Sequence, residues 1–135
     1  MNIDSKKVEI NTTAKSIYEF VSNFNNFSRL IPSQVEGWKS TEDTCSFKVG
    51  GFMQIDLRMS EKIPYSKVVV APDMSTASSL PFQLIVSLTE KNGYTETMVS
   101  VKIEGNSMML MMVKGKIKPA LDTMVEQLKY FAENR

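Results

Sequence analysis

Residues 99–128, VSVKIEGNSMMLMMVKGKIKPALDTMVEQL, contain the change of pattern that decides the fold. Before Gly105, apolar and polar side chains alternate with a period of two, which is typical of a β-strand. After Ser107, apolar side chains advance in steps of four and three, as they do along one face of an α-helix: Ile117, Leu121, Met124, Leu128 and Phe131. The pattern predicts a strand followed by a helix of residues 107–133, about 40 Å long at about 1.5 Å per residue.

The predicted helix has two weak positions near its middle. Gly115 is a poor helix former, and Pro119 lacks the N–H of a helical hydrogen bond. The sequence therefore predicts a kink or a break there, with Asn106 or Ser107 as the N-cap. Charged side chains fall outside the apolar stripe: Lys118, Asp122, Glu126, Lys129 and Glu133.

The middle of the chain has the period of a strand. The clearest alternation is in residues 52–63, FMQIDLRMSEKI. Residues 82–104 predict a hairpin, because Asn92-Gly93 supplies the positive φ angles of a tight turn. A loop is expected over residues 73–81, and the other predicted strands are EGWKS (36–40), CSFKV (45–49) and SKVVVA (66–71). Consecutive strands joined by short turns imply an antiparallel meander.

The start of the chain predicts one strand and two short helices. SKKVEI, residues 5–10, alternates and indicates the first strand. Thr12 or Thr13 is the predicted N-cap of a helix with apolar positions at Ile17, Phe20, Val21 and Phe24. NNFSRLI, residues 25–31, is expected to form a second helical turn that ends at Pro32.

These elements predict a single α+β domain over residues 1–135. It has a curved antiparallel sheet of about seven strands, two short helices after the first strand and a long C-terminal helix. The sheet must bury its apolar face, and the long helix is the one element with enough apolar stripe to cover it. A strongly curved sheet around one helix does not close tightly everywhere, so a cavity is predicted between them.

Three stretches carry a resemblance to a known superfamily. They are VEINTTAKSIYEFVSNFNNFSRLIP (8–32), GGFMQIDLRMSEKIP (50–64) and VSVKIEGNSMMLMMVKGKIKPALDTMVEQL (99–128). Over essentially its whole length the chain resembles the START-like superfamily with the helix-grip fold. That superfamily includes Bet v 1-type allergens, START lipid-transfer domains and polyketide cyclase/dehydrase-type proteins. The resemblance implies a pocket between the sheet and the long helix for lipids, sterols, quinones or polyketides, and it brings no shared catalytic motif.

Composition argues against several functional classes. The net charge of +1, from 16 basic and 15 acidic residues, argues against a non-specific nucleic-acid binder. The chain has no histidine, the commonest general base and metal ligand, and Cys45 is its single cysteine. We expect no metal, no cofactor and no catalytic residue. The longest apolar run, residues 108–113, is far shorter than the ~20 residues that span a bilayer. Together with the polar N-terminus, this predicts a cytoplasmic protein without stable membrane insertion.

The run MMLMM, residues 108–112, has two interpretations. Methionine re-packs around irregular shapes, so the run could form a deformable wall of a ligand pocket. It could equally fill core space or form the contact of a homodimer. Together with the inward faces of the strands, the first interpretation predicts these ligand contacts: Phe47, Met53, Ile55, Leu57, Met59, Leu84, Val86, Val99, Val101, Met108, Met109 and Met112.

Three functions follow from this pattern. The leading prediction is binding or transport of a small hydrophobic or amphipathic ligand. The alternatives are a polyketide cyclase- or dehydratase-like enzyme, which would need acid–base groups in the cavity, and a dimerising interaction module without a ligand. Asp56 and Arg58 are predicted on a solvated face, and Cys45 as a small core residue. Trp38 is expected either near the pocket mouth or at a strand edge.

Overall fold

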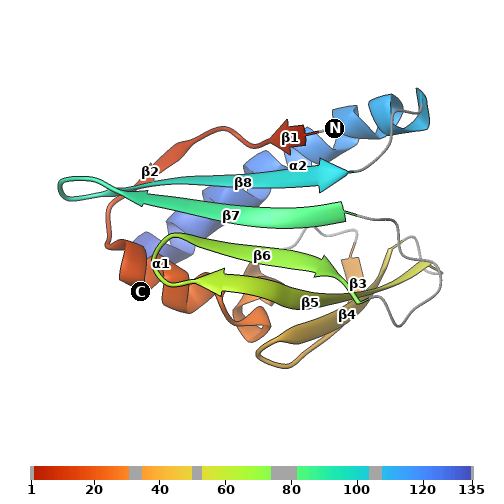
Figure 1. Cartoon of the computed structure of the whole chain (residues 1–135), viewed down its shortest axis with the longest axis horizontal. Coiled ribbons are helices and arrows are strands. Elements are labelled where there is room, and N and C mark those ends of the chain that lie inside the picture. The colour runs from red at the N-terminus through yellow and green to blue at the C-terminus, as the bar shows by residue number, and fades with distance from the viewer. Residues whose placement is uncertain (1, 31–34, 50–52, 74–81, 104–107, 135) are drawn as a thin grey trace.

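A curved antiparallel sheet lies against one long helix in the structure, a computed structural model (Figure 1). The structure describes residues 2–30, 35–49, 53–73, 82–103 and 108–134, and only the backbone of residues 49, 53 and 108–113. Over these residues the sheet has eight strands in the order β1-β8-β7-β6-β5-β4-β3, with β2 also paired to β8. The elements are β1 (Asn2–Asp4), β2 (Val8–Ile10), α1 (Ala14–Val21), the 3₁₀ helix η1 (Phe24–Arg29), β3 (Val35–Ser40), β4 (Thr44–Val49), β5 (Met53–Ile63), β6 (Lys67–Pro72), β7 (Phe82–Glu90), β8 (Thr95–Ile103) and α2 (Met108–Glu133).

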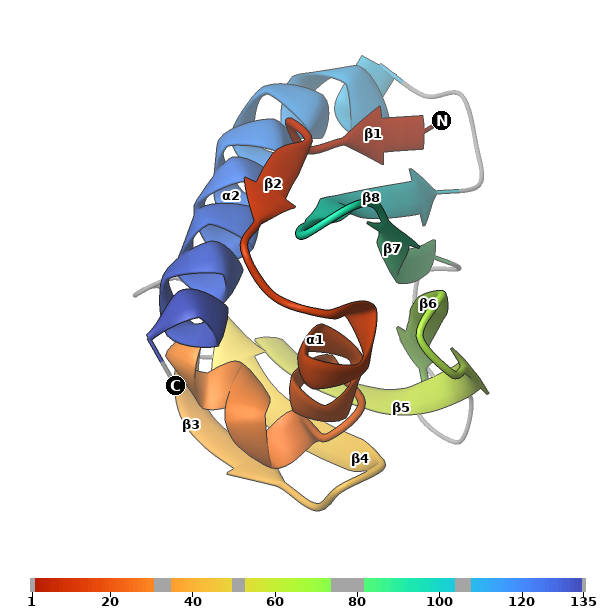
Figure 2. The ribbon, with the colours of Figure 1, turned by 90° about the vertical axis from the view of Figure 1, so that its left-hand side faces the viewer.

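The helices lie on the concave side of the bent sheet, as Figure 2 shows. α2 packs on β1, β2 and β8, whereas α1 packs on β6 and β7. The predicted α+β helix-grip architecture is confirmed, including the two short helices that follow the first strands.

The predicted first strand over residues 5–10 is wrong in its bounds: only Val8–Ile10 of it is a strand (β2), and a separate strand, β1, precedes it at Asn2–Asp4. Asp4 pairs with Ser100 and Val8 with Thr97, so the N-terminal segment has one residue more than its partner, as at a β-bulge. Ser5 lies at the break: its N–H donates to the Val99 carbonyl at 2.8 Å, and its Oγ accepts from the Val99 N–H at 2.9 Å. A buried serine hydroxyl therefore replaces a backbone group in the ladder.

The first short helix begins where the polar residues predict. The Thr13 hydroxyl accepts from the Ser16 N–H at 3.2 Å, so Thr13 is the N-cap of α1. The Glu90 carboxylate of β7 accepts from the Ala14 N–H at 2.8 Å and satisfies a second free donor of that helix end. α1 ends at Val21, and Phe24 belongs to η1. The predicted second helical turn is thus a 3₁₀ helix that starts one residue earlier, in the aromatic stretch.

The predicted hairpin is confirmed, but its turn differs from the prediction. β7 and β8 pair from Phe82–Ile103 to Glu90–Thr95. The turn closes with the Lys91 N–H donating to the Tyr94 carbonyl at 2.8 Å. Gly93 has a φ of +87°, whereas Asn92 has no positive φ. One glycine in the left-handed region is enough to reverse the chain here.

α2 continues through Gly115 and Pro119, so the predicted break does not occur. Both residues are exposed, and water can therefore reach the helix carbonyl that proline leaves without a donor. The buried stripe of the helix holds it in place: Leu121, Val125 and Leu128 are at most 3% exposed. Packing of this face outweighs the weak propensity of the two residues.

The charged flank of α2 binds the first strands rather than facing only water. Lys129 Nζ donates to the Glu9 carbonyl at 2.5 Å, and Lys118 Nζ donates to the Asp4 carbonyl at 3.1 Å. The Lys6 N–H donates to the Asp122 carboxylate at 2.7 Å, and the Asn11 N–H to the Glu133 carboxylate at 2.8 Å. Lys6 also forms an ion pair with Glu126. Side chains of the helix thus satisfy backbone groups that an edge strand would otherwise leave free.

Candidate functional site

A cavity of about 140 Å³, which we call the apolar cavity, lies between η1, the sheet and α2. No single element forms it, because its lining comes from η1, from α2 and from the five consecutive strands β3 to β7. The residues that line it are Phe24, Phe27, Val35, Trp38, Phe47, Leu57, Val70, Leu84 and Met124. The place is the one that the architecture predicts for a pocket.

Aromatic rings form one wall of the apolar cavity. Trp38 stacks on Phe47 with 5.6 Å between ring centroids and an interplanar angle of 17°. Phe24 meets Trp38 edge-on at 6.4 Å and Phe27 at 5.1 Å. Edge-on and offset arrangements are the favourable ones for aromatic pairs. The chain therefore holds a rigid aromatic surface beside the cavity.

A bulge in β3 creates this wall. Gly37 has a φ of +65°, and the register between β3 and β4 shifts between Glu36 and Lys39. In a regular strand, Val35 and Trp38 would point to opposite faces because they are three positions apart. The extra residue of the bulge turns both toward the apolar cavity. The glycine can take this backbone conformation at little steric cost.

Aliphatic side chains form the rest of the lining. Val70 of β6 and Leu84 of β7 are paired in register, and Leu57 lies on β5. Met124 approaches from α2 and is half-buried. The cavity therefore has a stiff aromatic side and a softer side that includes one methionine.

Among the described residues, apolar atoms form the surface of the cavity. The indole nitrogen of Trp38 is buried and has no hydrogen-bond partner in the part of the chain that the structure describes. None of the described side chains in the lining is an acid, a base or a nucleophile.

No known family model matches the sequence, and no curated protein matches it. Solved structures do match over nearly the whole chain. A START superfamily protein from Mycobacterium smegmatis is 14% identical with a TM-score of 0.70, and the match covers 98% of this chain and 97% of that chain. An Aha1 dimer from Colwellia psychrerythraea is 15% identical with a TM-score of 0.67, over 98% and 96%. DynU16, a protein of the dynemicin biosynthetic locus, is 13% identical with a TM-score of 0.69, over 98% of this chain and 47% of that chain.

This chain has the START/Bet v 1-like fold. At these identities the likeness concerns the fold alone. In the START-like fold of this chain, the apolar cavity lies between the sheet and the long helix. Across the described segments, no helix combines the length and the apolar composition needed to cross a bilayer.

The structure brings three of the predicted ligand contacts to the apolar cavity: Phe47, Leu57 and Leu84. Ile55 and Met59 pack against the core without lining the cavity. Three others are buried in the core away from it: Val86, Val99 and Val101. The remaining predicted contacts, Met53, Met108, Met109 and Met112, have side chains outside the described part of the structure. Ligand contact stays a prediction for each of these residues.

One of the two predictions for Trp38 placed it near the pocket mouth. Six lining residues were not among the predicted ligand contacts: Phe24, Phe27, Val35, Trp38, Val70 and Met124. Phe24 and Met124 belong to predicted helical stripes, which mark burial but not a cavity. Val35 and Trp38 depend on the bulge at Gly37. A glycine inside an otherwise regular strand was the signal that could have indicated it.

Cys45 lies in the core, as the sequence predicts. It is 5% exposed, and burial raises the pKa of its thiol to about 12. The thiol therefore stays protonated at neutral pH and is a poor nucleophile.

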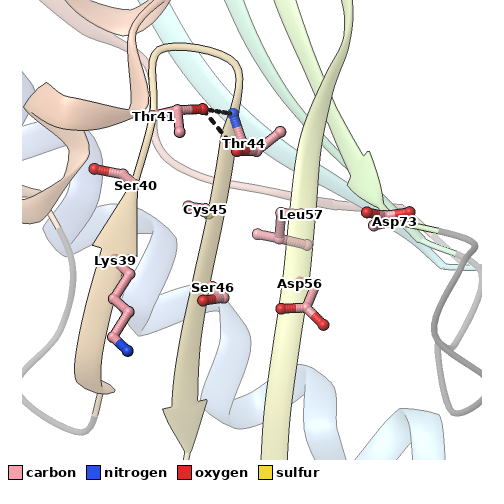
Figure 3. Close-up of a pocket in the computed structure, with 9 residues that line it drawn as sticks. All are labelled: Lys39, Ser40, Thr41, Thr44, Cys45, Ser46, Asp56, Leu57 and Asp73. Atoms are coloured by element: carbon pink, nitrogen blue, oxygen red, sulfur yellow. Dashed lines mark hydrogen bonds between the residues drawn. The ribbon is translucent and has the colours of Figure 1, made fainter.

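A second cleft, of about 350 Å³, lies over β3, β4 and β5 (Figure 3). Lys39, Ser46 and Asp56 form a row across the three strands, since Ser46 is in register with both other residues. Asp56 alternates with the cavity-lining Leu57, so this polar row lies on the opposite face of the sheet. Asp56 is half-buried and Arg58 is exposed. The described residues contain no group of three or more side chains that could hold a metal ion.

Proposed function

We propose that the chain binds a small apolar molecule in the apolar cavity. The observation that carries the proposal is a lining made of apolar side chains from seven elements, at the interface of the sheet with α2 and η1. Apolar lining with few polar groups is the usual composition of small-molecule sites. The START-like fold supports ligand binding at the same place, between the sheet and the long helix.

The volume limits the size of the ligand. Pockets for drug-sized molecules measure roughly 300–1,000 Å³, whereas an apolar cavity of roughly 150 Å³ in another protein stays dry and holds benzene. At about 140 Å³, the cavity of this chain fits one aromatic ring with a short substituent. A sterol or a two-chain lipid is much larger than this space.

An empty cavity is unfavourable for the folded chain. At roughly 24 cal/mol per Å³, leaving about 140 Å³ unfilled costs on the order of 3 kcal/mol. A ligand that fills the space restores the missing contacts on both the aromatic and the aliphatic wall. Because the described lining offers no acid–base group, the support extends to binding and not to a reaction.

A titration with α-methylstyrene, followed through the ¹³C-labelled methionine methyl groups, tests the proposal. The methyl group of Met124, assigned with Met124→Leu, is expected to shift in a saturable one-to-one manner, and the unfolding temperature is expected to rise. Leu84→Phe fills part of the cavity and is expected to weaken binding at least tenfold.

Ile63→Phe is the matched control, because it adds a ring on β5 at a side chain that is 38% exposed and outside the lining. It is expected to leave the affinity unchanged. No saturable shift with benzene, toluene or α-methylstyrene, or an equal loss in both variants, would overturn the proposal.

A homodimer through residues 108–113 is a separate proposal for a partner. The similar protein from Colwellia psychrerythraea is described as a dimer, which supports it. Light scattering after size exclusion is expected to show a dimer for the wild type and a monomer for Met109→Lys and Met112→Lys. An unchanged mass in both variants would remove this proposal.

A further inference from the structure

We propose that the second cleft, on the outer face of β3, β4 and β5, binds a small zwitterion, with the ligand's carboxylate at Lys39 and its ammonium group at Asp56. The outer face is the one opposite the apolar cavity. The inference therefore concerns a separate site and does not depend on the proposed function.

The bulge in β3 places Lys39 on the outer face. Between Glu36 and Lys39 the register shifts, so three steps along β3 match two steps along β4. The extra residue brings both side chains to one face, whereas a regular strand would put them on opposite faces. The bulge that directs Trp38 to the apolar cavity thus directs Lys39 to the second cleft.

Opposite charges lie at the two ends of one row across the second cleft, as Figure 3 shows. Ser46 is in register with Lys39 on one side and with Asp56 on the other. Because neighbouring strands are about 4.8 Å apart, the α-carbons of Lys39 and Asp56 are separated by roughly 10 Å. Asp73 adds a second carboxylate at the acidic end, since its N–H donates to the Asp56 carbonyl at 2.9 Å.

The other hydroxyl groups of the second cleft are already paired within the protein. The hydroxyls of Thr41 and Thr44 share a hydrogen bond of 2.6 Å. Ser40 Oγ donates to Asn25 Oδ1 of η1, also at 2.6 Å. These side chains close the turn between β3 and β4 and fasten it to η1, so the groups that could bind a ligand are those of the row.

The side chains of the row have few partners of their own. In the described part of the chain, the Lys39 ammonium and the Ser46 hydroxyl bond to no other residue. The Asp56 carboxylate accepts a long hydrogen bond, 3.3 Å, from Gln54 Nε2. Ser46 lies between the two charges, and its hydroxyl can donate to a carboxylate or accept from an ammonium group.

A ligand with two opposite charges can satisfy both ends of the row at once. Lys39 is exposed and Asp56 is half-buried, so water screens both, and each ion pair strengthens binding at most about fivefold. Useful affinity therefore requires that one molecule makes both contacts. The volume of about 350 Å³ leaves room for a short chain between the two charges, which selects a linear ω-amino acid.

Three probes of similar chain length test the inference. 6-Aminohexanoate carries both charges, hexanoate only the negative one and hexylamine only the positive one. The backbone amides of Ser46 and Asp56, followed in ¹H–¹⁵N spectra, are expected to shift in a saturable manner with the zwitterion, with a Kd on the order of 1 mM at low ionic strength. Each single-charge probe is expected to bind about fivefold more weakly, and added salt should weaken all three.

Variants of the wild-type chain show which groups bind the probe. Lys39→Gln and Asp56→Asn are each expected to weaken binding of 6-aminohexanoate about fivefold. Lys102→Gln is the matched control, because it removes an exposed lysine of β8 outside the second cleft, and the affinity should stay unchanged. Lys39→Glu combined with Asp56→Lys exchanges the charges, so most of the binding should return with the ligand reversed.

Two results on the wild type would overturn the inference: no saturable shift with 6-aminohexanoate, or equal affinity for the zwitterion and a single-charge probe. An equal loss in Lys39→Gln and Lys102→Gln, or no recovery when the charges are exchanged in a folded protein, would also contradict it. None of these results bears on the apolar cavity, and the affinity for α-methylstyrene is expected to be the same in Lys39→Gln and the wild type.

Discussion

The buried stripe of α2 has two kinds of surroundings. Val125 and Leu128 are at most 1% exposed, and charged residues at the flank of the helix bond to the backbone of the first strands. Met124, one turn before Leu128, is half-buried and borders the apolar cavity. One helix thus has tightly packed positions and a position beside open space.

This difference shows that the side chains that stabilise the fold and those that border the apolar cavity are largely different ones. The sheet bends, so α2 can touch only part of it at full packing density (Figure 2). The strands farther along, β3 to β7, are left to close the space with η1. Stability should therefore depend most on the fully buried side chains, and ligand binding most on the side chains that border the apolar cavity.

Truncating one fully buried leucine and one cavity-lining leucine is the strongest test of this difference. Leu128→Ala is expected to lower the free energy of unfolding by about 3 kcal/mol, because the surrounding core cannot collapse into the gap. Leu84→Ala removes a half-buried side chain next to existing space, so a loss of about half that size is expected. Urea unfolding measures both, and equal losses would contradict the distinction.

Glycine-to-alanine changes compare a backbone position that orients a cavity residue with one that does not. Gly37 and Gly93 both have positive φ, and an added Cβ would meet no atom within 4 Å at either place. Each change is expected to cost about 1 kcal/mol for backbone reasons alone. Gly37→Ala should also weaken ligand binding, because the bulge orients Trp38, while Gly93→Ala at the distant hairpin should not. Isothermal titration of both variants would show whether binding depends on the bulge.

The same chemical change at Gly115 is expected to stabilise the protein, whereas at Gly37 and Gly93 it destabilises it. Gly115 is exposed in α2, has no positive φ and has open space where the methyl group of an alanine would lie. Alanine is the better helix former, so the free energy of unfolding is expected to rise by about 0.5–1 kcal/mol. A loss of stability in thermal unfolding would show that the helix needs glycine there for contacts beyond its own backbone.

Acid is expected to lower the stability of the protein without changing ligand binding, and this is the smallest of the predicted effects. The hydrogen bond from the Lys6 N–H lowers the pKa of Asp122, and that from Lys129 lowers the pKa of Glu133. A lowered pKa in the folded state adds stability above the ordinary pKa, and this stability is lost as the pH falls toward the lowered value. Both carboxylates are near solvent, so the contribution is small and weakens with salt.

Melting curves between pH 7 and pH 3 test this expectation. Asp122→Asn and Glu133→Gln should flatten the decline at the acid end. The described cavity lining has no titratable side chain, so the affinity for α-methylstyrene should stay constant while the protein is folded. A binding constant that changes with pH in this range would indicate an ionisable group near the ligand.

Local periodicity was sufficient to predict most of the fold. The stripe from Ile117 to Phe131 and the alternation in β5, β7 and β8 indicated the layers and their order. Departures from periodicity were not predictable in the same way. The break at Ser5 depends on a hydroxyl that reaches Val99, 94 positions along the chain, and no local pattern contains that contact.

The sequence predicted where the cavity lies, but not most of the residues that line it. Phe47, Leu57 and Leu84 follow from strand phase, since they lie on inward faces. Trp38 does not, because one bulge residue reverses the phase of everything beyond it. Continuity of α2 through Pro119 was likewise missed, because tertiary packing outweighs helix propensity.

The bonds between α2 and the first strands have a consequence for the order of events during synthesis. Lys6 meets Glu126 across 120 positions of sequence, and β1 and β2 pair with β8 near the other end of the chain. On the ribosome, the N-terminal strands therefore emerge long before their partners exist. These pairings close loops of about ninety residues, so folding of this domain is expected to be slow for its size.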